Sequence, residues 1–213
     1  MISLYDTTLL LILLSVLLAF GSSRILTMIK VISFQGVVVS AIPLLNHAQL
    51  DLTNLSFALI MISVRGIIIP LLLYYAVIKV SVKREIEPLI GYHLSIFTGL
   101  LLILFSFYIS AKFRFPVDHP DKLMLPTAIA ISMAGMFLLM ARRKAITMLI
   151  GYMMLENGIY LIGAGFSKRT HHIVEAVILL DVLVGIMIMG IVLYNIKKTF
   201  DDIDTTLLRK LKD

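Results

Sequence analysis

Two apolar runs separated by three basic residues indicate how this chain folds. Residues 123–165 read LMLPTAIAISMAGMFLLMARRKAITMLIGYMMLENGIYLIGAG, so that runs 123–141 and 145–165 flank a basic turn. Each run is close to the roughly 20 residues that a helix needs to cross about 30 Å of hydrocarbon. Only helices and closed barrels satisfy the backbone in lipid, and these runs are too long for barrel strands. The stretch therefore predicts a helical hairpin that crosses a membrane twice.

Five further apolar runs have the same character: 7–22, 25–45, 54–78, 89–110 and 173–196. Of the 213 residues, 60% are hydrophobic and 15% are charged, whereas a soluble domain averages about 45–50% apolar and about 25% charged residues. Seven helices of about 21 residues use roughly 147 residues and leave only loops and a tail. The chain is predicted to be an all-α polytopic membrane protein with seven transmembrane helices, and a soluble domain is excluded.

The basic residues set the expected orientation. With the N-terminus outside, nine of the basic residues near helix ends face the cytoplasm and five face the other side, which favours an N-out, C-in arrangement in the cytoplasmic membrane. The cytoplasmic set is Arg24, Lys79, Lys83, Arg84, Arg142, Arg143, Lys144, Lys197 and Lys198. Because most basic residues flank apolar runs, the net charge of +6 indicates membrane topology and not nucleic-acid binding. We interpret the first run as a retained helix and not a signal peptide.

The chain resembles itself at an offset of about 120 residues. Residues 24–28 match residues 144–148, and residues 66, 75 and 79 match residues 185, 194 and 198. We therefore predict two parallel three-helix units, 1–80 and 123–198, joined by a linking fourth helix and loop at 81–122 and followed by a cytoplasmic tail at 199–213. Chance similarity between apolar stretches is the alternative.

Five ionisable residues fall inside the expected helices: Glu156, Glu175, Asp181, Arg65 and Lys30. Counting 1.5 Å per residue places Glu156, Asp181 and Arg65 near the middle of the bilayer. Charges there are costly and usually mark ion pathways. We interpret these three as a proton relay in which Arg65 biases the two carboxyl groups, whereas a static buried ion pair is the alternative. Glu175 is either an exit carboxylate or an interfacial residue, and Lys30 is mainly structural.

Other features surround the predicted relay. Helix 145–165 carries a seam for helix packing on one side and a polar strip around Glu156 on the other. Pro70 leaves the carbonyl of Gly66 without its usual donor and should kink the helix beside Arg65. Gln35 extends the polar route. The seam consists of Gly151, Gly158 and Gly165, and the polar strip of Tyr152, Asn157 and Tyr160.

The residues 149–158 and 181–185 resemble the K subunit of bacterial complex I, in which a glutamate and a second carboxylate occupy comparable helices. Here the glutamate is displaced by three residues, with Met153 at the family position, and the second carboxylate is Asp181. The chain is still more similar to component E of hydrogenase-4-type complexes, through Gly151-Tyr152, Glu156-Asn157-Gly158, Asp181 and the basic tail at 208–212.

These resemblances imply a non-redox membrane subunit of a formate hydrogenlyase-like or ferredoxin-linked hydrogenase complex. They imply no cofactor in this chain, with NiFe and iron–sulfur centres carried by the hydrogenase peripheral arm. They also imply antiporter-like and anchor subunits as partners, together with lipids. No catalytic motif or metal site is visible, and the chain has no cysteine. Two alternatives stay open: a subunit of a multi-subunit cation/proton antiporter, and a structural spacer of the membrane arm.

Overall fold

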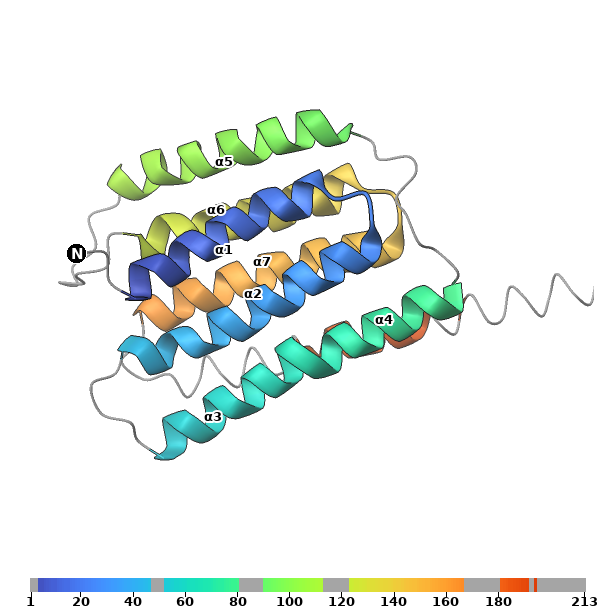
Figure 1. The fold of residues 1–213 in the computed structure, drawn as a ribbon, viewed down its shortest axis with the longest axis horizontal. Coiled ribbons are helices and arrows are strands. Elements are labelled where there is room, and N and C mark those ends of the chain that lie inside the picture. Colours follow the sequence, from blue (N-terminus) through green and yellow to red (C-terminus); the bar gives the residue numbers. More distant parts are fainter. Residues whose placement is uncertain are drawn as a thin grey trace, which may run out of the picture.

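The chain folds as a bundle of helices, shown as a ribbon in Figure 1. The computed structural model describes residues 4–46, 52–80, 90–112, 123–166, 181–191 and 194. Its elements are α1 (Leu4–Gly21), α2 (Ile25–Asn46), α3 (Leu52–Ser63), the π-helical turn η1 (Val64–Ile68), α4 (Ile69–Val80), α5 (Tyr92–Lys112), α6 (Met124–Ala141), α7 (Ala145–Phe166) and a short helix, Asp181–Ile191.

Six of these helices are long and apolar enough to cross a membrane: Leu4–Gly21, Ile25–Ile42, Ala58–Ile78, Tyr92–Lys112, Met124–Ala141 and Ala145–Gly163. The prediction of an all-α, multi-pass membrane protein is thereby confirmed. Of the expected seventh span, 173–196, the structure describes the Asp181–Ile191 helix and Tyr194. The rest of that span, including Glu175, and the tail at 199–213 lie outside the described residues.

Two helical hairpins have matching dimensions. Helices α1 and α6 both contain 18 residues, and α2 and α7 both contain 22. Short turns at 22–24 and 142–144 join them, so the two hairpins are offset by 120 residues in the chain. The two-unit arrangement as a whole stays a prediction, because the last helix of the second unit is described only in part.

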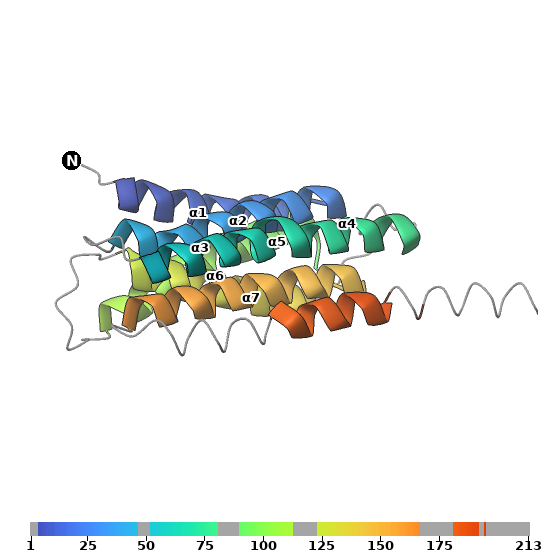
Figure 2. The same cartoon turned by 90° about the horizontal axis from the view of Figure 1, so that it is seen from below.

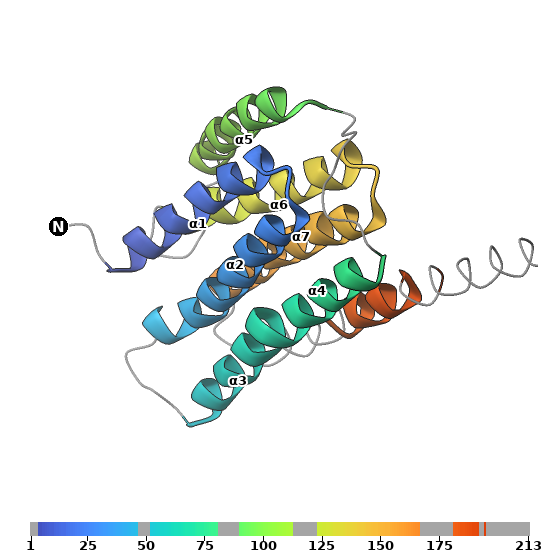
Figure 3. The ribbon, with the colours of Figure 1, turned by 45° about the vertical axis from the view of Figure 1, so that its right-hand side comes forward.

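The helices lie side by side, with α5 along one edge against α1 and α6 (Figure 1). The α3–η1–α4 helix lies along the opposite edge and packs on α2. Turning the molecule shows the Asp181–Ile191 helix beside α4 and α7 (Figures 2 and 3). Helix α5 leaves most of its apolar side chains exposed, whereas α7 is largely covered by its neighbours. The centre of α7 is therefore the most enclosed part of the bundle.

The most extensive helix contact joins α6 and α7 through glycines. A Cβ on Gly135 would lie 2.3 Å from the backbone nitrogen of Leu155, and one on Gly151 would lie 2.9 Å from the backbone nitrogen of Leu139. Gly158 meets the backbone of α6 in the same way. Backbones this close leave no room for side chains. The structure thus places Gly151 and Gly158 in the packing seam, and the surroundings of Gly165 lie outside the described residues.

Candidate functional site

One buried arginine gathers three polar side chains in the middle of the bundle. Arg65 donates from Nη2 to Oε1 of Glu156 at 2.6 Å, from Nε to Oδ2 of Asp181 at 3.2 Å and from Nη1 to Oδ1 of Asn157 at 3.1 Å. The first two contacts are ion pairs. The side chains come from η1, α7 and the Asp181–Ile191 helix, so the cluster joins three helices. We call these four residues the Arg65 cluster.

The Arg65 cluster is almost completely shielded. Arg65 is 2% exposed, Glu156 3% and Asp181 5%. At 1.5 Å per residue, Arg65 lies about 20 Å from either end of its helix and Glu156 about 15 Å from either end of α7. The structure brings together the three charged residues that the sequence placed near the middle of the bilayer.

The charges of the Arg65 cluster do not balance if all its groups are ionised. Glu156 and Asp181 bind the same edge of the guanidinium, formed by Nε and Nη2. Two carboxylates against one guanidinium leave one net negative charge in a dry site, where an uncompensated charge is costly. One proton on the carboxyl pair makes the cluster neutral and supplies a hydrogen-bond donor between the two acids.

A π turn presents Arg65 to the cluster. Between α3 and α4 the helix widens over Val64–Ile68, and the backbone N–H of Ile69 bonds to the carbonyl of Val64, five residues earlier. Such turns are rare and occur frequently at functional sites. The sequence indicated a kink at this point, since Pro70 cannot donate to Gly66. The irregularity takes the form of a π turn that contains Arg65.

Pro70 has no N–H to donate to the carbonyl of Gly66, and a side chain of the neighbouring helix α2 donates to that carbonyl instead. The hydroxyl of Ser33 on α2 donates to the carbonyl oxygen of Gly66 at 2.6 Å. Close packing makes this possible, because a Cβ on Gly36 would lie 3.0 Å from both the Cβ and the carbonyl oxygen of Arg65. Helix α2 thus supports η1 from behind. Neither Ser33 nor Gly36 was singled out from the sequence, where an interhelical partner leaves no local signal.

The two tyrosines of the polar strip lie in different surroundings. The ring of Tyr160 stacks under the guanidinium of Arg65, with 5.1 Å between Cζ and the ring centroid. This cation–π contact makes Tyr160 the fourth side chain that contacts the guanidinium, after the three hydrogen-bond partners. Tyr152 is half-buried and lines an apolar groove between α7 and the Asp181–Ile191 helix. No hydrogen bond joins either tyrosine to Glu156 in the described part of the chain.

No described hydrogen bond or ion pair joins Gln35 or Lys30 to the Arg65 cluster. Gln35 is fully buried and donates from Nε2 to the hydroxyl of Ser15 at 2.6 Å. Its Oε1 atom, like Nδ2 of Asn157, is buried without a hydrogen-bond partner among the described residues. Ordered water commonly serves such atoms in polar sites. Lys30 is exposed on α2 and joins no described polar contact.

A second buried arginine was not identified as such from the sequence. Arg142, expected simply at the cytoplasmic face, is 2% exposed. It donates from Nη2 to the backbone carbonyl of Phe20 near the end of α1 and lies 4.9 Å from the ring centroid of Tyr92 on α5. A cation at a helix C-terminus is favourable because the last carbonyl groups there lack helical donors. Because Arg142 lies in a turn with two other basic residues, the sequence did not reveal its contact with the end of α1.

Comparisons with known proteins relate this chain to two groups of proteins. Residues 123–213 match the family model of NADH-ubiquinone/plastoquinone oxidoreductase chain 4L. An uncharacterized protein of Mycobacterium tuberculosis is 28% identical over 189 residues, which cover 87% of this chain and 85% of that protein. Hydrogenase-4 component E of Escherichia coli K12 is 23% identical over 146 residues, or 68% of each chain, and the Shigella flexneri protein gives the same values. No solved structure matches.

The helices and the comparisons together define a multi-pass integral membrane protein with a K-like, or chain 4L-like, C-terminal half. The chain is related to hydrogenase-4 component E, so both resemblances noted in the sequence are confirmed. Within the described residues, no group of three or more histidine, aspartate or glutamate side chains is arranged to hold a metal ion.

Proposed function

We propose that this chain is a non-redox membrane subunit of a membrane-bound hydrogenase complex, in which its buried carboxyl groups take part in proton translocation coupled to electron transfer. The observation that carries the proposal is the sharing of one guanidinium by Glu156 and Asp181. The similarity to hydrogenase-4 component E favours a hydrogenase complex as the assembly. NiFe and iron–sulfur centres then belong to the partner subunits, among them the peripheral arm.

The chemistry of the Arg65 cluster suits a proton-transfer step. With one proton shared by the two acids, the cluster is neutral. Removing that proton leaves a net negative charge, and adding a second proton leaves a net positive one. Each change alters how strongly Arg65 is held by Glu156 and Asp181, since both bind the same edge of the guanidinium. Movement of charge in a partner subunit would bias these states and so move a proton.

The proposed orientation follows the basic residues, with the N-terminus outside and the C-terminus in the cytoplasm. The Arg65 cluster is then reached from the two sides by different routes. On one side, the route is proposed to use the buried polar atoms of Asn157 and Gln35 that have no partner among the described residues. On the other, Tyr152 lies one helical turn from Glu156. Glu175 is proposed as the carboxylate near the outer end of the last helix.

The decisive experiment replaces each acid by its amide in the intact complex. Glu156→Gln and Asp181→Asn are expected to leave the complex assembled and to reduce proton pumping at least tenfold per electron pair transferred, because an amide cannot release the proton. Pumping is measured in proteoliposomes with a pH-sensitive dye, beside the electron-transfer rate. Asp6→Asn is the matched control, an acid in the first turn of α1 outside the Arg65 cluster. Normal pumping in both amide variants would favour a structural spacer.

Copurification separates the hydrogenase proposal from the antiporter alternative. A tag on this chain is expected to recover hydrogenase and iron–sulfur subunits from membranes. A cation/proton antiporter subunit would bring down only membrane partners, and that result would overturn the assignment to a hydrogenase complex while leaving the role of the Arg65 cluster open to the amide test.

A further inference from the structure

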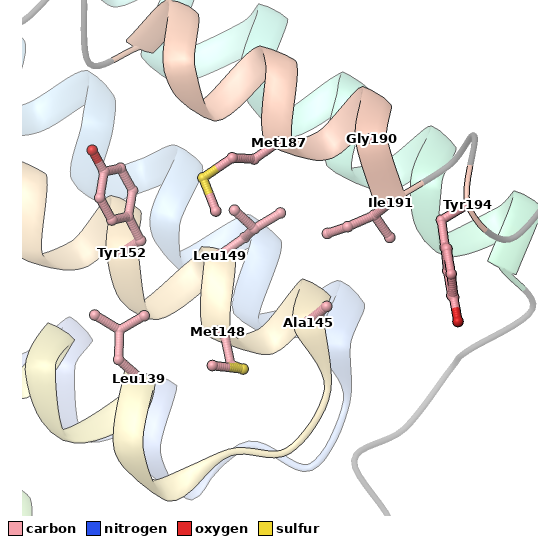
Figure 4. A pocket seen from close by; sticks show the side chains of 9 residues that line it. All are labelled: Leu139, Ala145, Met148, Leu149, Tyr152, Met187, Gly190, Ile191 and Tyr194. Carbon is pink, nitrogen blue, oxygen red and sulfur yellow. The ribbon is translucent and has the colours of Figure 1, made fainter.

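An apolar groove of about 540 Å³ lies between α7 and the Asp181–Ile191 helix, next to the end of α6. Figure 4 shows that Met187 and Ile191 face Leu149 across it, with Tyr152 at one end and Tyr194 at the other. The full lining is Leu139, Ala145, Met148, Leu149, Tyr152, Met187, Gly190, Ile191 and Tyr194. The groove therefore presents hydrocarbon-like side chains along most of its length.

The dimensions of the groove suit a thin, flexible chain. From Ala145 to Tyr152 it follows α7 for about 10 Å, which is less than the roughly 15 Å thickness of one leaflet's hydrocarbon. A hydrocarbon tail fits this length, and the lining of the groove is almost entirely apolar.

Two basic residues precede the groove-lining residue Ala145 in the chain. They are Arg143 and Lys144, in the turn between α6 and α7. Arg143 is exposed and Lys144 is half-buried. Basic residues between membrane helices at an interface are suited to anionic headgroups. We propose that this groove binds one acyl chain of an anionic phospholipid whose phosphate is held by Arg143 and Lys144.

The bound lipid would also isolate the Arg65 cluster. The far end of the groove is Tyr152, one helical turn from Glu156. A tail that reaches Tyr152 excludes water from this approach to the carboxyl pair. The lipid site itself does not rest on the proposed function, because it stands on the shape of the groove and the charge beside it.

The test uses the absence of tryptophan from this chain. In a Tyr194→Trp variant, the single tryptophan reports on the basic end of the groove. The full chain is reconstituted in phosphatidylcholine vesicles that contain a small fraction of brominated lipid, which quenches tryptophan on contact. We expect brominated phosphatidylglycerol to quench at least twice as strongly as brominated phosphatidylcholine at the same mole fraction. Changing Arg143 and Lys144 to glutamine should remove this preference.

Two glycines of one helix provide a matched pair that separates lipid binding from folding. A Cβ on Gly190 or on Gly185 meets no atom of the described residues within 4 Å, so both positions accept a side chain without a clash against that part of the chain. Only Gly190 lines the groove. In the Tyr194→Trp background, Gly190→Leu should reduce quenching by phosphatidylglycerol at least twofold, whereas Gly185→Leu should leave it unchanged.

Three results would overturn the proposal. Equal quenching by both brominated lipids would indicate an ordinary lipid-facing surface. Equal behaviour of Gly190→Leu and Gly185→Leu would show that the groove is not where the lipid binds. A tryptophan that neither lipid quenches would mean that protein, such as a second copy of this chain, covers the groove.

Discussion

The protein buries two arginines, and they are held in different ways. Both Arg65 and Arg142 are 2% exposed, and both lie about 5 Å from a tyrosine ring. Arg142 lies in the turn between α6 and α7 and donates to a backbone carbonyl at the end of α1. Arg65 lies in mid-helix and donates to two carboxylates. The hydrogen bond described for Arg142 goes to a carbonyl, which cannot titrate, whereas two of the three hydrogen bonds that Arg65 donates go to carboxyl groups, which can.

This difference assigns the two arginines different roles. A carbonyl keeps its charge distribution at every pH, so the contact between Arg142 and Phe20 is suited to fixing one helix end against another. Under the proposed function, the carboxyl groups around Arg65 exchange protons, and this cation is then coupled to proton occupancy. Both arginines are equally buried, so the proposed difference in role rests on the chemistry of their partners.

The largest effect is expected for Arg65→Met. The substitution leaves Glu156 and Asp181 buried without a cation, which costs about 3–5 kcal/mol when a charge stays unpaired. Both acids then need a proton to remain buried, so thermal stability should fall as pH rises and pumping should be lost. Melting curves of the purified complex at several pH values, with pumping assays, test this. A variant that pumps normally would contradict the role of Arg65.

A smaller effect, of another kind, is expected for Arg142→Met. Loss of a charged hydrogen bond to the carbonyl of Phe20 should lower the free energy of unfolding by about 1.5–3 kcal/mol. Pumping per assembled complex should be unchanged, because no group of the Arg65 cluster is altered. The measurement is the yield and melting temperature of the complex beside its pumping ratio. A lowered pumping ratio at full assembly would remove the contrast between the two arginines.

Loss of the hydrogen bond that Ser33 donates to the carbonyl of Gly66, beside Arg65, should have a still smaller effect. Ser33→Ala removes the hydroxyl donor to Gly66 and should cost about 1 kcal/mol. Pro70→Ala restores a backbone N–H four residues after Gly66, so the double variant should recover part of the loss. A double-mutant cycle on melting temperature measures this coupling. Strictly additive losses would show that Ser33 does not substitute for the donor that Pro70 lacks.

The smallest effect is expected for Tyr160→Phe. Phenylalanine keeps an aromatic face under the guanidinium, so stability and pumping should both change little. Tyr160→Leu, in which the face is lost, should be the more harmful change, by about 1–2 kcal/mol. Comparing their melting temperatures separates the ring from the hydroxyl. An equal loss in both variants would assign the effect to the hydroxyl instead.

The sequence predicted much of this fold because lipid imposes simple constraints on it. Apolar runs of about 20 residues define helices, and charges within them stand out against the background, as Glu156, Asp181 and Arg65 do. What the sequence could not specify is the partner of each polar group. Nothing near Gly66 in the chain points to Ser33, and the spacing of Tyr152 and Tyr160 about Glu156 does not reveal that one stacks on Arg65 while the other lines a groove. These contacts depend on how helices distant in sequence rotate against one another.

The π turn at Val64–Ile68 makes the position of Arg65 depend on chain length. A π turn accommodates one residue more than a regular turn, so every residue beyond it is shifted by about 100° around the helix axis. Removing a single exposed residue of the turn, such as Ile67, would let the segment relax into an ordinary helix and rotate one half of it against the other. The arginine could thus be disengaged from its acids by a deletion of one codon, with its own chemistry untouched.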